Sequence, residues 1–107
     1  MKKRLTLEDI LHALREDLPD LYKEYGVEKI AIYGSFAKGE SGDKSDVDIL
    51  VQLSRPLGLR FIRLADHLEE RLGRSVDLAT FDSLKRSLEN PRRAHIAADI
   101  ERTLTYV

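Results

Sequence analysis

The chain has 107 residues, of which 42% are hydrophobic and 35% are charged. This composition predicts one globular domain over residues 1–107 and excludes a disordered or low-complexity protein. The 18 Lys and Arg residues nearly balance the 19 Asp and Glu residues, for a formal net charge of −1, so a general nucleic-acid coat, which needs a basic excess, is not expected.

A helix is predicted near the start of the chain, from Leu7 onward. Thr6 and Asp9 have the spacing of a capping box at its N-terminus. Apolar residues then recur at helical spacing. Pro19 is expected to break or restart this helix, because proline lacks the backbone N–H that a helix interior uses. Gly26 is a favourable C-terminal stop.

Three strands are predicted after this helix, from segments rich in β-branched and aromatic residues. They cover residues 27–33, 46–53 and 75–80. Helical segments are predicted between and after them, over residues 36–38, 57–72, 81–87 and 92–104. The segment over 57–72 has the length of a crossover connection between parallel strands. The pattern therefore predicts an α/β (α+β) fold in which helices flank a small mixed β-sheet.

Three aspartates on the predicted strands are the candidate catalytic residues. Asp46 and Asp48 are two positions apart, so both side chains project from one face, with Cα atoms roughly 6.5–7 Å apart. Unpaired carboxylates so close would repel each other, and a bound divalent cation such as Mg²⁺ removes that cost. Asp77 interrupts a hydrophobic strand and would lie beside the pair if the second and third strands are neighbours. Three such carboxylates can hold two ions about 3.5–4 Å apart for phosphoryl transfer.

A phosphate site is expected where the first strand meets the short helix, at Gly34 and Ser35. A helix start presents free backbone N–H groups and a partial positive charge. Glycine lets the backbone approach a phosphate closely, and the serine hydroxyl can donate a hydrogen bond. Each feature alone is more often structural: a turn, a solvated polar face or a surface aspartate. The combination favours a functional site.

Two rival motifs fail on inspection. Residues 34–41 nearly match a phosphate-binding P-loop, but Glu40 stands where the lysine that grips the phosphates is required. Asp43, Asp46 and Asp48 also loosely suggest a calcium loop. The spacing, the central glycine and the terminal glutamate of an EF-hand are all missing.

The stretch Gly34-Ser35, ten residues and then Asp46-x-Asp48 resembles the signature of the DNA polymerase β-like nucleotidyltransferases. The flanking text, IYGSFAKGESGDKSDVDILV and LGRSVDLAT, looks like the minimal nucleotidyltransferase (MNT) branch. The similarity covers residues 27–80 and, more weakly, the C-terminal end. It implies the polymerase β-like nucleotidyltransferase fold.

The resemblance also implies a role for each candidate residue. Asp46 and Asp48 would ligate two Mg²⁺ ions, and Asp77 would complete the metal site and help to deprotonate the incoming hydroxyl. The remaining residues would hold the phosphates of ATP: Gly34 and Ser35, with Ser45 and Lys38 as helpers. Relatives often carry arginine at the position of Lys38, so a positive charge is kept but bidentate phosphate contact is lost.

The implied reaction is attack of a hydroxyl on the α-phosphate of ATP, which releases pyrophosphate and leaves AMP attached. The length leaves no residues for a substrate-binding domain, so we expect a partner protein to supply the acceptor. In the resembled family that partner is a helical HEPN protein, an RNA-cleaving toxin, and the nucleotidyltransferase is its antitoxin. The alternative is a non-catalytic binding module that neutralises the partner by occlusion. The intact set of three carboxylates favours the enzyme, and the oligomeric state is left open.

The remaining sequence features concern location. The chain contains no cysteine, which excludes disulfides, thiolate zinc sites and cysteine nucleophiles. No apolar run approaches the length of a membrane span, and no signal-peptide core follows the basic start. We therefore expect a cytoplasmic protein with no membrane partner.

Overall fold

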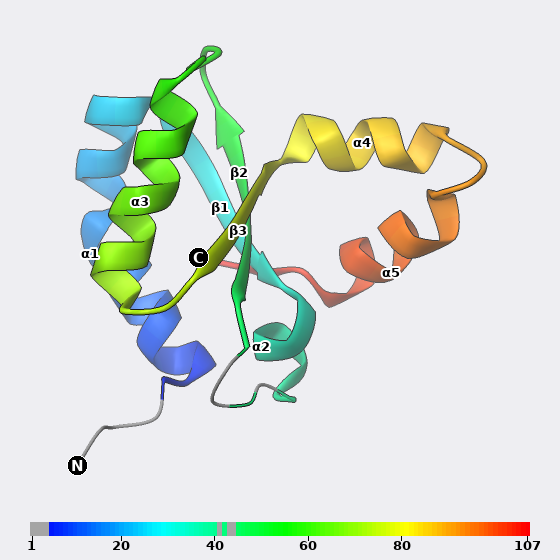
Figure 1. Cartoon of the computed structure of the whole chain (residues 1–107), viewed down its shortest axis with the longest axis horizontal. Helices are drawn as coiled ribbons and strands as arrows, with labels where there is room; N and C mark the ends of the chain where they lie inside the picture. Colours follow the sequence, from blue (N-terminus) through cyan, green and yellow to red (C-terminus); the bar gives the residue numbers. More distant parts are fainter. Residues whose placement is uncertain (1–4, 41, 43–44) are drawn as a thin grey trace.

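The computed structural model describes residues 5–40, 42 and 45–107. In chain order its elements are α1 (Leu7–Tyr25), β1 (Val27–Tyr33), α2 (Gly34–Lys38), β2 (Val47–Leu53), α3 (Arg60–Leu72), β3 (Val76–Thr80), α4 (Phe81–Glu89), α5 (Ala94–Thr103) and β4 (Thr105–Tyr106). Helices α1 and α3 lie together on one side of the sheet, and α4 and α5 extend from the other side (Figure 1). None of the helices in these residues combines the length and apolarity that a membrane crossing requires.

The four strands form one mixed sheet in the order β3-β2-β1-β4. Strand β1 is antiparallel to both β2 and β4, whereas β2 and β3 are parallel. Helix α3 is the crossover that a parallel pair requires. The predicted mixed sheet with flanking helices is confirmed. Strand β4 was not predicted, because a strand of two residues is too short to show a periodic pattern.

The two faces of the sheet are buried to different extents. Val47, Ile49 and Val51 alternate along β2 and are fully buried in the main core, together with residues of α1 and α3. Leu50, on the opposite face, packs in a smaller cluster with Leu84 of α4 and Ala97 of α5. Because side chains alternate along a strand, Asp48 lies on this second face. The larger core therefore anchors β2 and leaves Asp48 free for other contacts.

Helix α1 continues through Pro19, so the predicted break is wrong. Both ends of the helix are capped: Thr6 and Asp9 form the predicted capping box, and the Gly26 N–H bonds to carbonyls of the last turn. Leu14 and Leu21, on either side of the proline, are buried in the main core. Pro19 itself is exposed. Tertiary packing of the flanking turns therefore outweighs the cost of one missing hydrogen bond.

Other boundaries shift by a few residues. The helix predicted over 57–72 begins at Arg60, because Gly58 has a positive φ of 57°. The segments predicted over 81–87 and 92–104 are α4 and α5. The strand predicted from Asp46 begins at Val47.

The capped helix gives a stability prediction. Pro19→Ala restores the N–H that can donate to the Arg15 carbonyl, and alanine has the highest helix propensity. We expect the free energy of unfolding to rise by about 1–2 kcal/mol, since the proline penalty is partly offset by its restriction of the unfolded chain. Urea unfolding measures the change, with Asp20→Ala as the neighbouring exposed control. A lower stability for the proline variant would contradict this account.

Candidate active site

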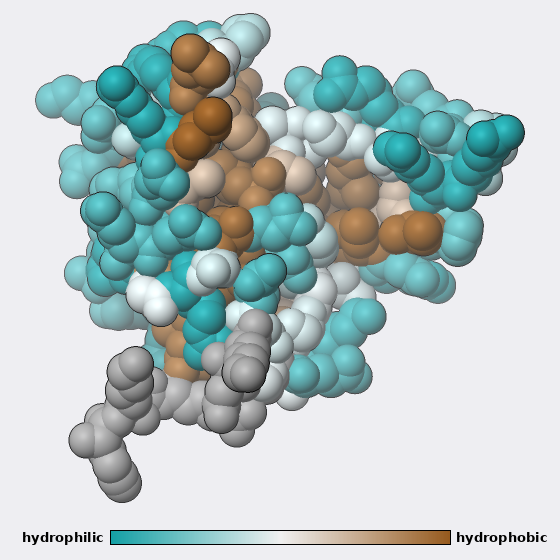
Figure 2. Space-filling model, viewed as in Figure 1, coloured by the Kyte–Doolittle hydropathy of each residue, from teal (hydrophilic) through white to brown (hydrophobic). Residues whose placement is uncertain are grey.

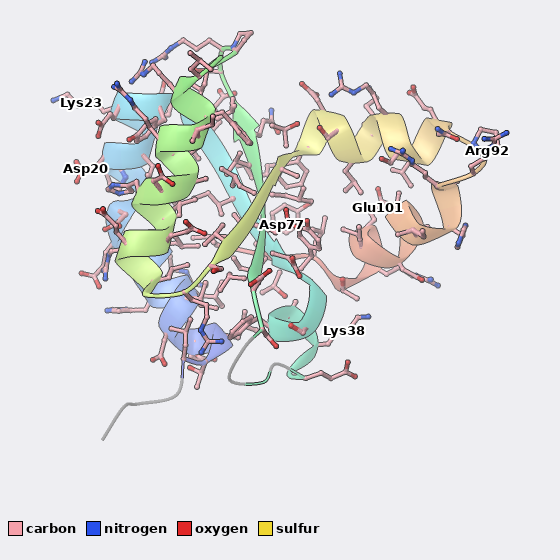
Figure 3. All side chains as sticks on the ribbon, viewed as in Figure 1. Asp20, Lys23, Lys38, Asp77, Arg92 and Glu101 are labelled. Atoms are coloured by element: carbon pink, nitrogen blue, oxygen red, sulfur yellow. The ribbon has the colours of Figure 1, made fainter. Side chains whose placement is uncertain are left out.

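Three neighbouring strands place Tyr33, Asp48 and Asp77 in one row across the sheet. Tyr33 of β1 pairs with Asp48 of β2, and Asp48 pairs in turn with Asp77 of β3. Directly paired residues project from the same face. Asp77 lies on β3, an edge strand of the sheet that runs beside β2 (Figure 3). The expected neighbourhood of the second and third strands is confirmed, and it brings two of the three candidate carboxylates side by side.

Asp46 takes a different position from the one expected. It stands immediately before β2 and is exposed, so it is not a strand residue that alternates with Val47. The Val47 N–H donates to the Ser75 carbonyl at 2.9 Å, which fixes the backbone next to Asp46. The charge of Asp46 still acts on Asp48. The two carboxylates are therefore near each other, although not as a pair on one strand.

The raised pKa of Asp48 indicates a cluster of negative charges without a cationic partner among the described residues. Burial raises the pKa of the Asp48 carboxyl, and the charges of Asp77 and Asp46 raise that pKa further. Within residues 5–40, 42 and 45–107, none of these three carboxylates has an ion pair with a cationic side chain. Repulsion between unneutralised carboxylates favours either a proton or a bound cation. The donor set thus fits Mg²⁺, which prefers carboxylate oxygens.

The carboxylates alone do not enclose a metal ion. Among the described residues, no group of three His, Cys, Asp or Glu side chains has the arrangement of a complete metal site. Mg²⁺ is usually held by one or two carboxylates, water and substrate phosphates, rather than by a cage of protein ligands. An open half-site is therefore compatible with binding of the ion together with a nucleotide.

Tyr33 is a site residue that the sequence reasoning missed. Burial, followed by the charges of Asp77 and Asp48, raises its pKa to about 12. The phenol therefore stays protonated at neutral pH and remains a hydrogen-bond donor. The available signal was its position directly before Gly34 and Ser35, but only strand pairing shows that it adjoins the carboxylates.

Gly34 begins α2 and lies against Asp48. Its φ of 73° is in the left-handed region that glycine adopts readily, and a Cβ at this position would collide with Asp48 Oδ2. Ser35, in the first turn of α2, is half-buried. The strand-to-helix turn predicted to hold phosphates therefore directly adjoins a predicted metal ligand.

The two predicted helper residues occupy the edges of this region. Lys38 is exposed in the last turn of α2 (Figure 3). Ser45 is half-buried, and its Oγ accepts a hydrogen bond of 2.8 Å from the Gly42 N–H. The Ser45 hydroxyl is thus already used to shape the segment before Asp46.

A cavity of about 260 Å³ lies next to the row, between the sheet and the α4–α5 pair. Tyr33 belongs to both the row and the cavity wall. Leu50 and Ala79 form its sheet side, each two residues beyond an aspartate of the row, and α5 contributes Ala97 and Ile100. Hydrophobic atoms are visible in this space in Figure 2. The carboxylates and a mostly apolar cavity therefore share one face of the sheet.

The repulsion at Asp48 predicts that removal of its charge stabilises the folded protein. Asp48→Asn should raise the free energy of unfolding at pH 7 by up to about 1 kcal/mol, a small value because solvent screens a partly exposed group. When folding raises the pKa of a carboxyl, the protein becomes less stable as the pH rises from the unfolded-state pKa to the folded-state pKa of that group. The gain of the variant should therefore vanish below the ordinary pKa of 3.8.

Denaturant unfolding of both proteins across this pH range tests the prediction, with Asp66→Asn on α3 as a control for loss of an exposed carboxylate. An Asp48→Asn variant that is less stable than the wild type at pH 7 would show that the carboxylate is not under repulsion.

Comparison with known proteins agrees with this geometry. The nucleotidyltransferase domain model matches residues 11–103. Protein adenylyltransferase MntA of Thermococcus cleftensis is 39% identical over 104 residues, which are 96% of this chain and 97% of that protein. A solved structure of a candidate minimal nucleotidyltransferase has a TM-score of 0.68 at 30% identity and covers 97% of this chain and 98% of its own. A toxin–antitoxin structure with AMP-PNP has a TM-score of 0.53 at 29% identity over 74% of this chain and 60% of that chain. The chain therefore belongs to the nucleotidyltransferase domain family.

Proposed function

We propose that the chain is a Mg²⁺-dependent adenylyltransferase that transfers AMP from ATP to a hydroxyl group of a partner protein. The observation that carries the proposal is the contact between the Gly34 turn and the Asp48 carboxylate, with Asp77 paired beside it. This contact sets a helix start next to unneutralised carboxylates. The relatives named as protein adenylyltransferases support the choice of reaction.

We assign each carboxylate a role in metal binding. Asp46 and Asp48 would hold two Mg²⁺ ions, with Asp77 completing the site on the β3 side. Bound Mg²⁺ supplies charge neutralisation on the phosphates and polarises the α-phosphoryl group. Tyr33, which stays protonated, offers a neutral hydrogen-bond donor beside the carboxylates.

The transfer itself is an in-line substitution at the α-phosphorus. The acceptor oxygen forms the new bond to phosphorus, while the bond between phosphorus and the bridging oxygen breaks and pyrophosphate leaves with the electron pair. The acceptor proton passes to the Asp77 carboxylate and then to water. Gly34 and Ser35 would hold the β- and γ-phosphates, helped by Lys38 and Ser45.

The cavity beside Tyr33 is the place we propose for the nucleoside part of ATP. Its volume of about 260 Å³ and its mostly apolar wall suit a flat heteroaromatic base. The Gly34 turn and this cavity lie on either side of Asp48. A nucleotide can therefore place its phosphates on the turn and its base under α5, with the α-phosphate at the carboxylates.

The acceptor and partner are proposed from the relatives. A solved toxin–antitoxin structure was determined with AMP-PNP. We accordingly propose a helical HEPN-type toxin as the partner and an antitoxin role for this chain. The second candidate function is inhibition by occlusion, in which binding alone neutralises the partner. The unneutralised row of Asp48 and Asp77 favours the enzyme, because a pure binder gains nothing from clustered like charges.

A label-transfer assay tests the function. The purified chain is incubated with ATP labelled at the α-phosphate, Mg²⁺ and the helical partner encoded beside it. We expect label on the partner, and loss of more than about 99% of the rate in Asp46→Ala and Asp48→Ala, because each removes a ligand that neutralises the transition state. Partner inhibition that survives both changes without any label transfer would instead establish the binding module.

Narrowing the cavity tests the nucleoside site separately. Ala79→Val suits a strand but fills part of the cavity, so the KM for ATP should rise about tenfold or more while kcat changes little. Ala65→Val on α3, on the opposite side of the sheet, is the matched control. Unchanged KM in the Ala79 variant, with normal folding, would exclude this cavity as the nucleoside site.

A further inference from the structure

Arg74 connects three segments that meet at the carboxylates. It follows α3 and precedes β3. Its Nη1 donates to the carbonyls of Gly42 and Ser45, at 3.2 and 3.0 Å. Its guanidinium carbon lies 5.5 Å from the ring centroid of Phe36 in α2. One side chain thus contacts the segment before β2 and the helix that begins with Gly34.

The two residues whose carbonyls Arg74 contacts are also hydrogen-bonded to each other. The Gly42 N–H donates to Ser45 Oγ at 2.8 Å, and the Ser45 N–H donates to the Gly42 carbonyl at 3.2 Å. Hydrogen bonds from a charged donor are stronger than neutral ones, so Arg74 adds two strong contacts to this pair of residues.

Asp46 lies between two anchors supplied by consecutive residues. Arg74 holds the carbonyl of Ser45 on one side, and the Ser75 carbonyl accepts from the Val47 N–H at 2.9 Å on the other. Asp46 precedes β2, so no ladder partner fixes it as β3 fixes Asp48. The hydrogen bonds of Arg74 and Ser75 therefore fix the backbone around Asp46, as strand pairing does for Asp48.

The contact with Phe36 links this anchor to the phosphate turn. Phe36 is buried at 2% exposure and stands two residues after Gly34. A guanidinium against its ring packs on α2 while its N–H groups hold the Asp46 segment. A lysine ammonium, a point charge without a planar fork, would stack on the ring less well and bind the two carbonyls less specifically.

We propose that Arg74 is a positioning residue that sets Asp46 relative to the Gly34-Ser35 turn, so that metal and phosphates are held in one geometry. The proposal rests on the proposed function of this site and adds a residue to it. Arg74 acts through the backbone of Ser45 and through Phe36, and it need not touch the nucleotide.

Three variants test this role: Arg74→Ala, Arg74→Lys and the control Arg71→Ala, which removes an arginine of α3 that pairs with Asp17 at 3.0 Å. Electron paramagnetic resonance titration of Mn²⁺ with ATP reports the metal site, and amide hydrogen exchange at Ser45–Val47 reports the segment. We expect Arg74→Ala to weaken Mn²⁺ binding in the presence of ATP about 10–100-fold and to accelerate this exchange. The Mn²⁺ affinity and the exchange rate of Arg74→Lys should lie between those of Arg74→Ala and the wild type. Arg71→Ala should change neither readout.

Kinetics separate positioning from direct phosphate binding. A misplaced carboxylate should lower kcat about 100-fold with a smaller change in the KM for ATP. Unchanged Mn²⁺ affinity and unchanged exchange in Arg74→Ala would overturn the proposal. So would a loss confined to metal-free ATP binding, which identifies Arg74 as a phosphate ligand. If the alanine variant does not fold, the same readouts apply to Arg74→Lys.

The two proposals fail in different ways. Wild-type protein that transfers no label contradicts the adenylyltransferase function. The Mn²⁺ titration and the amide exchange do not depend on transfer, so they still decide whether Arg74 positions Asp46.

Discussion

The parallel register of β2 on β3 is the constraint on which the site depends. It sets Asp48 directly beside Asp77, and the antiparallel register of β1 adds Tyr33 to the same row. Burial raises the pKa of Asp48 and of Tyr33, and the charges of the neighbouring carboxylates raise both pKa values further. A fold selected only for stability would not keep this arrangement, because like charges beside each other cost free energy unless a cation neutralises them. The burial and mutual repulsion of these charges mark the place where a positively charged ligand is expected.

The hydrophobic core on the other face makes this arrangement possible. Val47, Ile49 and Val51 are all fully buried beneath α1 and α3. A shift of β2 by one residue would turn this whole apolar set toward α4 and α5 and expose it. Burial of one face therefore fixes the register that brings the charges together on the opposite face. Stability on one side of the sheet maintains an unfavourable cluster on the other side.

The partial cover of the second face leaves room both for the nucleoside site that we propose and for the approach of an acceptor. Helices α4 and α5 leave a cavity over Leu50 and Ala79, while Asp77 stays exposed. A small molecule can occupy the cavity, and a partner can approach the exposed side. The part of this face that the helices cover therefore separates the proposed nucleoside site from the exposed side of Asp77.

The amino-acid sequence alone determined the class of fold and most elements, because hydrophobic periodicity and glycine stops are local patterns. The Gly-Ser and Asp-x-Asp spacing, also local, predicted most residues of the candidate site. The sequence did not determine that α1 passes through Pro19, that residues 105–106 form β4, or that Asp46 stands before β2. Those outcomes depend on packing and on strand pairing between distant residues. The positions of Tyr33 beside the carboxylates and of Arg74 beside Ser45 were not predicted for the same reason, since their partners are distant in the sequence. Local spacing predicts candidate side chains, whereas only the sheet register and the long-range hydrogen bonds decide which of them meet.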